Sequence, residues 1–195
     1  NANAASPGTG LWSIVSGPGV ITNVNNASTT ITGVTAGDGS VPTVVRWTID
    51  NGVCGFTNED ITLINYTTPT VSNAGVDQSK CTDGDFTLAG NVALSGVGTW
   101  TIQGAANGAS ITGGEENLAN ATVTGLTAGT SVTLRWTIVN GVCAASFDEV
   151  VLTKLSAAPI ADAGVDIDQC ATSTFTLNAN AASPGTGLWS IVSGP

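Results

Sequence analysis

The stretch SVTLRWTIVNGVC, residues 131–143, decides the fold class of this chain. Its apolar residues, from Val132 to Ile138, occupy every second position, and Thr or Arg fills the positions between them. A period of two turns one face of an extended strand inward and the other outward. The Asn-Gly that follows at 140–141 is a strong signal for a tight hairpin turn with positive φ at both residues. The stretch therefore predicts a β-strand that turns back into an antiparallel partner.

This stretch recurs, so the chain is repetitive. RWTIDNGVC at 46–54 matches RWTIVNGVC at 135–143, an offset of 89. AGVDQSKC at 74–81 matches AGVDIDQC at 163–170 with the same offset. A repeat of about 88 residues has the length of a small β-sandwich.

A second period is longer. Residues 1–18 and 178–195 are identical, which gives a period of 195 − 18 = 177 residues. Repeats two apart are thus identical where they overlap, while neighbours have diverged. We interpret the chain as a window of a longer tandem array, made of a first repeat without its first strand (1–66), a complete second repeat (67–155) and the start of a third (156–195).

The second repeat shows the pattern of an all-β domain. No segment has apolar residues at the helical spacing i, i+3, i+4, i+7 between capping residues. The linkers between repeats are short and contain Pro. Seven short strands with frequent turns predict tandem immunoglobulin-like antiparallel β-sandwiches arranged end to end. We expect the strands near 71–80, 86–91, 99–103, 109–111, 121–124, 132–139 and 149–154.

Composition excludes several classes of function. Four basic and 14 acidic residues give a net charge of −10, which argues against nucleic acid as a partner. The chain has no His, which removes Ser-His-Asp and Cys-His catalysis and His-ligated zinc. No run approaches the roughly 20 apolar residues of a membrane span, so we expect no direct membrane insertion.

Two pairs of acids are the candidates for catalysis, Glu115–Glu116 in a loop and Asp148–Glu149 before the last strand. Glycoside hydrolysis needs two carboxylates across a substrate cleft, one of them with a raised pKa. Adjacent acids on a sandwich too small for a deep pocket do not meet this need. We predict that the chain is not an enzyme.

Asp162, Asp166 and Asp168 are the candidates for a calcium site at the start of the third repeat. Calcium binds several oxygens at one point, and a junction between extracellular domains is a natural place for it. The spacing matches no EF-hand loop, and solvated turn acids are the interpretation that we favour. We therefore expect no cofactor, with calcium as the alternative.

The tryptophans recur at equivalent strand positions. An exposed row of them would form a platform for sugars, but each falls on the inward phase of its strand, which favours a buried core. We expect Trp100 and Trp136 to face each other's sheet within one core. The five are Trp12, Trp47, Trp100, Trp136 and Trp189.

Each repeat contributes one cysteine after its first strand (Cys81, Cys170) and one after Asn-Gly-Val (Cys54, Cys143). A fixed pair per repeat in a His-free chain predicts disulfides and an oxidising, extracellular setting. Zinc bound by thiolates alone would need a CxxC cluster, and the sequence has none.

The order of strands determines which cysteines meet. Cys81 and Cys143 lie at opposite ends of one sandwich, roughly 30 Å apart, whereas bonded cysteines need Cα atoms within about 7 Å. We therefore predict inter-repeat pairing: Cys81 with the next block's equivalent of Cys54, and Cys143 with the preceding block's equivalent of Cys170. A bond between Cys81 and Cys143 is the alternative.

The order AGVDQ…C…TLAG…GTW…GLTAGT…RWTI.NGVC…DEVVLT resembles the PKD-like, immunoglobulin-like repeats of giant surface proteins in gliding and related Bacteroidetes. The resemblance covers nearly the whole chain. It implies export by the type IX pathway, display at the cell surface and a role in adhesion, gliding motility or filament formation. It supplies no catalytic residues.

Two functions follow from these patterns. The first is a structural segment of an extracellular stalk, adhesin or filament, whose partners are neighbouring repeats of the same array or fibre. The alternative is a carbohydrate-binding repeat array that holds surface glycans by avidity. Buried tryptophans favour the first function, and exposed tryptophans in a row favour the second.

Overall fold

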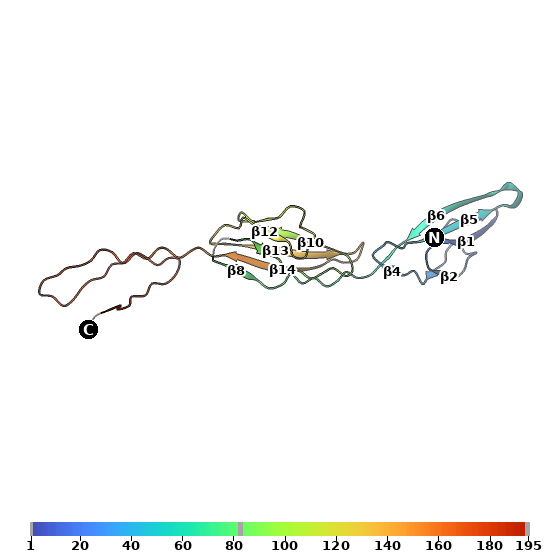
Figure 1. Cartoon of the computed structure of the whole chain (residues 1–195). Coiled ribbons are helices and arrows are strands. Elements are labelled where there is room, and N and C mark those ends of the chain that lie inside the picture. Colours follow the sequence, from blue (N-terminus) through green and yellow to red (C-terminus); the bar gives the residue numbers. More distant parts are fainter. Residues whose placement is uncertain (1, 82–83, 194–195) are drawn as a thin grey trace.

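The computed structural model describes residues 2–81 and 84–193, so five positions at the ends and within the predicted repeats lie outside it: Asn1, Thr82, Asp83, Gly194 and Pro195. The described chain is elongated, with three segments that follow one another in a row (Figure 1). No segment folds back on another, and the end-to-end arrangement is confirmed.

The larger sheet of the second repeat has four strands, in the order β10 (Val97–Gln103), β13 (Thr130–Val139), β14 (Ser146–Lys154) and β8 (Gln78–Lys80). The first three are antiparallel, and β8 runs parallel to β14 at the edge. Buried and partly exposed residues alternate along β13, as its sequence predicts.

The smaller sheet of the second repeat has the order β11 (Ser110–Ile111), β12 (Thr122–Thr124), β9 (Phe86–Thr87). Because both sheets turn their apolar faces inward, one core fills the space between them. The all-β, immunoglobulin-like sandwich is thereby confirmed. The core residues are Ala74, Phe86, Leu88, Trp100, Ala109, Ala121, Val123, Leu126, Val132, Leu134, Trp136, Ile138, Val150 and Leu152.

Trp100 and Trp136 are at the centre of this core. Each is 1% exposed, so their predicted burial is confirmed. The expectation that they face each other's sheet is wrong, because β10 and β13 are neighbours in one sheet and the two residues are register partners. Their rings contact side by side, with centroids 4.9 Å apart. The indole nitrogens donate to Leu118 O and Asn91 O, both at 3.1 Å.

The first repeat forms an equivalent but less covered sheet. Its buried cluster is small and consists of Trp12, Val45 and Trp47. Among the described residues of this repeat, no strand corresponds to β8 or β9. Its strands are β1 (Thr9–Ser16), β5 (Thr43–Asp50) and β6 (Phe56–Leu63) in one sheet, with the pairs β2 (Val20–Ile21) and β3 (Ile31–Thr32), and β4 (Ala36–Gly37) and β7 (Asn65–Tyr66).

The segment 156–193 forms no strand. Its Trp189 is 52% exposed, so the expectation that this tryptophan is buried is wrong here. The equivalents of β12, β13 and β14, which would cover it, do not belong to this segment. One backbone contact of the second repeat is nevertheless present in this segment. Asn180 N donates to Asp162 O at 3.0 Å, as Asn91 N donates to Asn73 O at 2.9 Å in the second repeat.

The Asn-Gly turns differ from the predicted tight hairpin. Asn51 has φ −116°, and a 3₁₀ turn at Gly52–Cys54 follows it. Gly52 has φ 60° and Gly141 has φ 55°. Only the glycine of each pair adopts positive φ, and the loops between the strands span 51–55 and 140–145. None of the residues that the structure describes forms a helix with the length and apolarity that a membrane crossing requires.

Candidate functional site

The first and second repeats meet in a contact that we call the junction. It joins the β4–β7 end of the first repeat, the linker after β7, and the loops before β10 and between β13 and β14 of the second repeat. It contains no Asp, Glu, Lys or Arg side chain. The junction consists of Gly37, Gly39, Tyr66, Thr67, Thr70, Ser95, Asn140, Gly141 and Cys143.

Asn140 is the centre of the junction and is 4% exposed. Its Nδ2 donates to Gly37 O at 3.1 Å and to Thr67 O at 2.9 Å. Thr67 Oγ1 and Ser95 Oγ, each at 3.1 Å, are further acceptors. One buried amide of the second repeat thus binds a backbone carbonyl of the first repeat and the linker together. A buried polar group needs such partners, and the docked repeat supplies one of them, the Gly37 carbonyl.

Tyr66 packs against a glycine on either side. A Cβ added to Gly141 would lie 2.4 Å from atoms of the Tyr66 ring, and one added to Gly39 would lie 2.7 Å from it. Distances below 3.0 Å are not tolerated, so both positions require a residue without a side chain. The ring of the first repeat therefore rests directly on the backbone of the β13–β14 loop.

The linker is bound along its length. Thr67 N donates to Gly37 O at 2.9 Å, and Thr70 N donates to Ser95 O at 3.0 Å. Thr67 Oγ1 and Ser95 Oγ are 2.6 Å apart, and Ser95 N donates to Thr70 Oγ1 at 2.8 Å. Because its backbone groups have fixed partners on both repeats, this linker does not act as a free hinge.

Asp38, between Gly37 and Gly39, is the acid nearest to the junction in sequence. Hydrogen bonds from the Ser40 side chain and backbone lower the pKa of its carboxyl. Ser40 N lies 2.9 Å from Asp38 Oδ1. The carboxylate is held in its own turn, and it is not among the junction residues.

The structure does not bring the calcium candidates together. Among residues 2–81 and 84–193, no three Cys, Asp or Glu side chains form a group that could hold a metal ion. Asp162 Oδ1 accepts a hydrogen bond from Gly164 N at 2.9 Å, as Asn73 Oδ1 does from Gly75 N at 2.8 Å in the second repeat. The carboxylate of Asp162 thus occupies the position of an amide that closes the same turn.

The acids considered for catalysis hold the backbone of the sandwich. Glu115 Oε2 accepts from Thr122 N at 2.6 Å, and Asp148 Oδ2 accepts from Ala74 N at 2.8 Å. Glu149 is paired with Arg135 at 2.7 Å. These side chains point to different backbone and side-chain partners and do not converge on one cleft.

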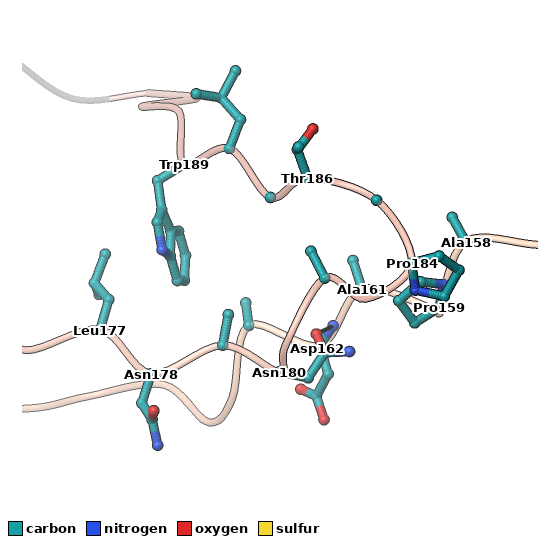
Figure 2. Close-up of a pocket in the computed structure, with 16 residues that line it drawn as sticks. Ala158, Pro159, Ala161, Asp162, Leu177, Asn178, Asn180, Pro184, Thr186 and Trp189 are labelled. Atoms are coloured by element: carbon teal, nitrogen blue, oxygen red, sulfur yellow. Dashed lines mark hydrogen bonds between the residues drawn. The ribbon is translucent and has the colours of Figure 1, made fainter.

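A hollow of about 690 Å³ lies in the third segment, between 158–163 and 177–189. Figure 2 shows the indole of Trp189 pointing into it, across from the stretch that carries Leu177 and Asn178. Trp189 and Leu177 are equivalent to Trp100 and Leu88 of the second repeat, which are 1% and 2% exposed. The hollow is the inner face of an unfinished sandwich, so we do not interpret it as a ligand pocket.

The four cysteines are unpaired in this chain. Cys143 lies at the junction, with Sγ 3.7 Å from Tyr66 O. Cys81 follows β8 at the opposite end of the same repeat, and Cys54 and Cys170 are exposed. No predicted inter-repeat partner lies within this chain, so the pairing stays a prediction.

No family model and no curated protein matches the chain. Among solved structures it is similar to the EC22–24 segment of mouse cadherin-23, with 10% identity and a TM-score of 0.37 over 88% of this chain. It is also similar to extracellular cadherin domains 1–5 of protocadherin gamma B2, with 11% identity and a TM-score of 0.29 over 76% of this chain. The chain spans 64% and 33% of those two structures.

Sequence reasoning missed the role of Asn140. It interpreted Asn-Gly as turn chemistry, whereas the asparagine side chain binds the neighbouring repeat. The signal available was the identity of NGVC at 51–54 and 140–143, which is stricter than a turn requires. Any residue that tolerates the turn would suffice for a hairpin, but only an amide or a similar donor can bind the junction carbonyls.

Proposed function

We propose that the chain is a structural segment of an extracellular stalk, adhesin or filament at the cell surface. The buried contact of Asn140 with Gly37 O and Thr67 O is the observation that supports this most. Successive repeats are joined by a fixed contact, so that an array gains reach with each repeat and resists bending. The resemblance to PKD-like repeats supports export and surface display.

The chemistry of the junction suits a load-bearing contact. Its hydrogen bonds join neutral groups, so changes in salt concentration screen them little. Each is worth about 0.5–1.5 kcal/mol net, and a buried amide left unpaired costs about 1–3 kcal/mol. Bending the junction therefore has an energetic cost, although no single interaction in it is strong.

Four of the five tryptophans argue against the carbohydrate-binding alternative, and the fifth, Trp189, is 52% exposed only in the incomplete third segment. A sugar platform requires exposed aromatic faces, and Trp12, Trp47, Trp100 and Trp136 are at most 8% exposed. The partners that we propose are therefore neighbouring repeats, and surface glycans are not needed to explain the described residues.

Small-angle X-ray scattering of the full chain tests this function. We expect the profile of a rod for the wild type and a smaller radius of gyration with signs of flexing for Asn140→Ala. Asn51→Ala is the matched control, because Asn51 occupies the same loop without a docked repeat and should leave the profile unchanged. A compact wild type, or an Asn140→Ala profile identical to the wild type, would contradict the proposal.

A further inference from the structure

Cys143 is placed at the junction by the loop that also carries Asn140. Its backbone N donates to Asn140 O at 3.1 Å, as Cys54 N donates to Asn51 O at 3.2 Å in the first repeat. The two loops are thus alike, but Cys143 is partly covered while Cys54 is exposed. The difference is the docked repeat, whose Tyr66 O lies 3.7 Å from Cys143 Sγ.

The opposite end of the second repeat shows where the other cysteine lies. β8 runs parallel to β14 with Lys80 beside Lys154, and Leu155 N donates to Lys80 O at 2.8 Å. The next step of this register places Cys81 beside Leu155. Cys81 therefore lies where the chain leaves the repeat, and it is exposed.

The repeat offset connects these two observations. Leu155 is equivalent to Tyr66 (155 − 89 = 66), and Cys170 is equivalent to Cys81 (170 − 89 = 81). In consecutive 177-residue blocks, the preceding block's Cys170 therefore lies beside Tyr66, the residue that Cys143 contacts from the other repeat. Adjacent strands are about 4.8 Å apart, and a disulfide tolerates a Cα separation of up to about 7 Å. Both cysteines thus lie against the same residue, Tyr66, one on the neighbouring strand of its own repeat and one on the docked loop.

We propose that each junction carries a disulfide, formed by Cys143 with the preceding block's Cys170 and by Cys81 with the following block's Cys54. The inference deepens the proposed stalk function and rests on it, since it requires end-to-end docking. The bond would lock the contact that Asn140 positions. It would also cross-link each repeat to the next, so that a pulling force could not separate two docked repeats without breaking a disulfide.

The bond forms by thiol–disulfide exchange. One thiolate attacks the disulfide of an exchange oxidant such as glutathione disulfide and releases one reduced thiol. The second cysteine then attacks the mixed disulfide, and the oxidant leaves as two thiols. Each protein cysteine loses its proton, and the two electrons pass to the oxidant, so atoms and electrons balance. Neither Cys143 nor Cys81 belongs to the buried core of the sandwich.

A two-block chain, residues 1–177 followed by residues 1–195, tests the pairing. In the first variant only the first block's Cys170 and the second block's Cys143 remain, and every other cysteine is replaced by serine. In the matched variant only Cys81 and Cys143 of the second block remain. Both are incubated with glutathione disulfide, and free thiols are counted by alkylation and intact mass under native conditions.

We expect the first variant to lose both free thiols and the mass of two hydrogen atoms, while the matched variant keeps both thiols. A bond in the matched variant, or free thiols in both, would overturn the inference. Small-angle scattering of the same chains separates this result from the proposed function. A reduced chain that stays a rod would leave the stalk standing without the disulfide, whereas a compact chain would remove both.

Discussion

The first and second repeats contain equivalent three-stranded sheets, but only the second repeat has a closed core. Val150 on β14 is 1% exposed, while its equivalent on β6, Ile61, is 45% exposed. The Trp136 indole nitrogen donates to Asn91 O at 3.1 Å, whereas that of Trp47 is buried without a hydrogen-bond partner. Antiparallel pairing therefore forms the sheet by itself, whereas burial of its inner face requires an additional part of the chain.

That additional part is the segment before β10. β8 covers the edge of β14, and Asn91 is held in place by its side-chain contacts with Val71 O at 2.9 Å and Asn73 N at 2.8 Å. In the first repeat Asn3 is the equivalent of Asn91, but this repeat contains no equivalents of β8, Val71 and Asn73, which correspond to positions within 156–177 of the third repeat. In the second repeat the opening residues 67–88 supply Ala74, Phe86 and Leu88 to the core, and the equivalent stretch of the third repeat is 156–177.

Truncating the central tryptophan of each sheet should have the largest effect. Trp136→Ala should destabilise the second repeat by about 3–5 kcal/mol, because it empties a closed core. Trp47→Ala should cost the first repeat less, because Trp47 packs with only two other buried residues, Trp12 and Val45. Amide hydrogen exchange along β13 and β5 measures both losses, and equal losses would show that the cores are equally complete.

Adding residues 156–177 before Asn1 should close the first core. Fully burying an Ile stabilises by about 1.5–3 kcal/mol, and Ile61 still has roughly half of that to gain. We expect about 1–2 kcal/mol of added protection in β5 and β6, measured by hydrogen exchange. The same extension with Leu177→Asp is the control, since the equivalent Leu88 is 2% exposed and an aspartate cannot be buried there. Equal protection by both extensions would mean that the segment does not enter the core.

A smaller effect is expected at the junction from Gly141→Ala. Both Gly141 and Gly52 have positive φ, which costs an alanine about 1–2 kcal/mol at either site. Only Gly141 lies against Tyr66, since nothing lies within 4 Å of a Cβ at Gly52. Gly141→Ala should therefore also speed exchange of the Thr67 amide, read by NMR, and Gly52→Ala should not. Equal exchange in both variants would show that the tyrosine contact does not hold the linker.

Periodicity in the sequence was enough to place the long strands. The predicted 132–139 and 149–154 lie within the observed β13 and β14. The first strand was predicted at 71–80, yet only Gln78–Lys80 pairs, because the Asn73 side chain closes a turn with Gly75 at φ 85°. The junction was not predictable from local pattern. The partners of Asn140 lie 73 and 103 residues away in the sequence. Neither the two-residue alternation of the strands nor the 89-residue repeat offset indicates which residues these are.

The smallest expected effect is the pH dependence of the cross-strand ion pair Arg46–Asp60. Arg46 Nε and Nη2 donate to the two Asp60 oxygens at 2.7 and 2.9 Å, and these hydrogen bonds lower the pKa of the carboxyl. A lowered pKa in the folded state adds stability at pH above the unfolded value of about 3.9. That stability is lost as the pH falls through the folded pKa.

Wild type and Asp60→Asn should thus differ most at neutral pH and converge in acid, with the wild type more stable where they differ. Both side chains are about 40% exposed, so the difference should be small and should shrink further in 1 M salt. Glu149→Gln removes the equivalent pair of the closed repeat and serves as the comparison. Thermal unfolding from pH 2 to 7 measures all three proteins. A gap between wild type and Asp60→Asn that widens in acid would show that the carboxylate opposes the fold of the open repeat.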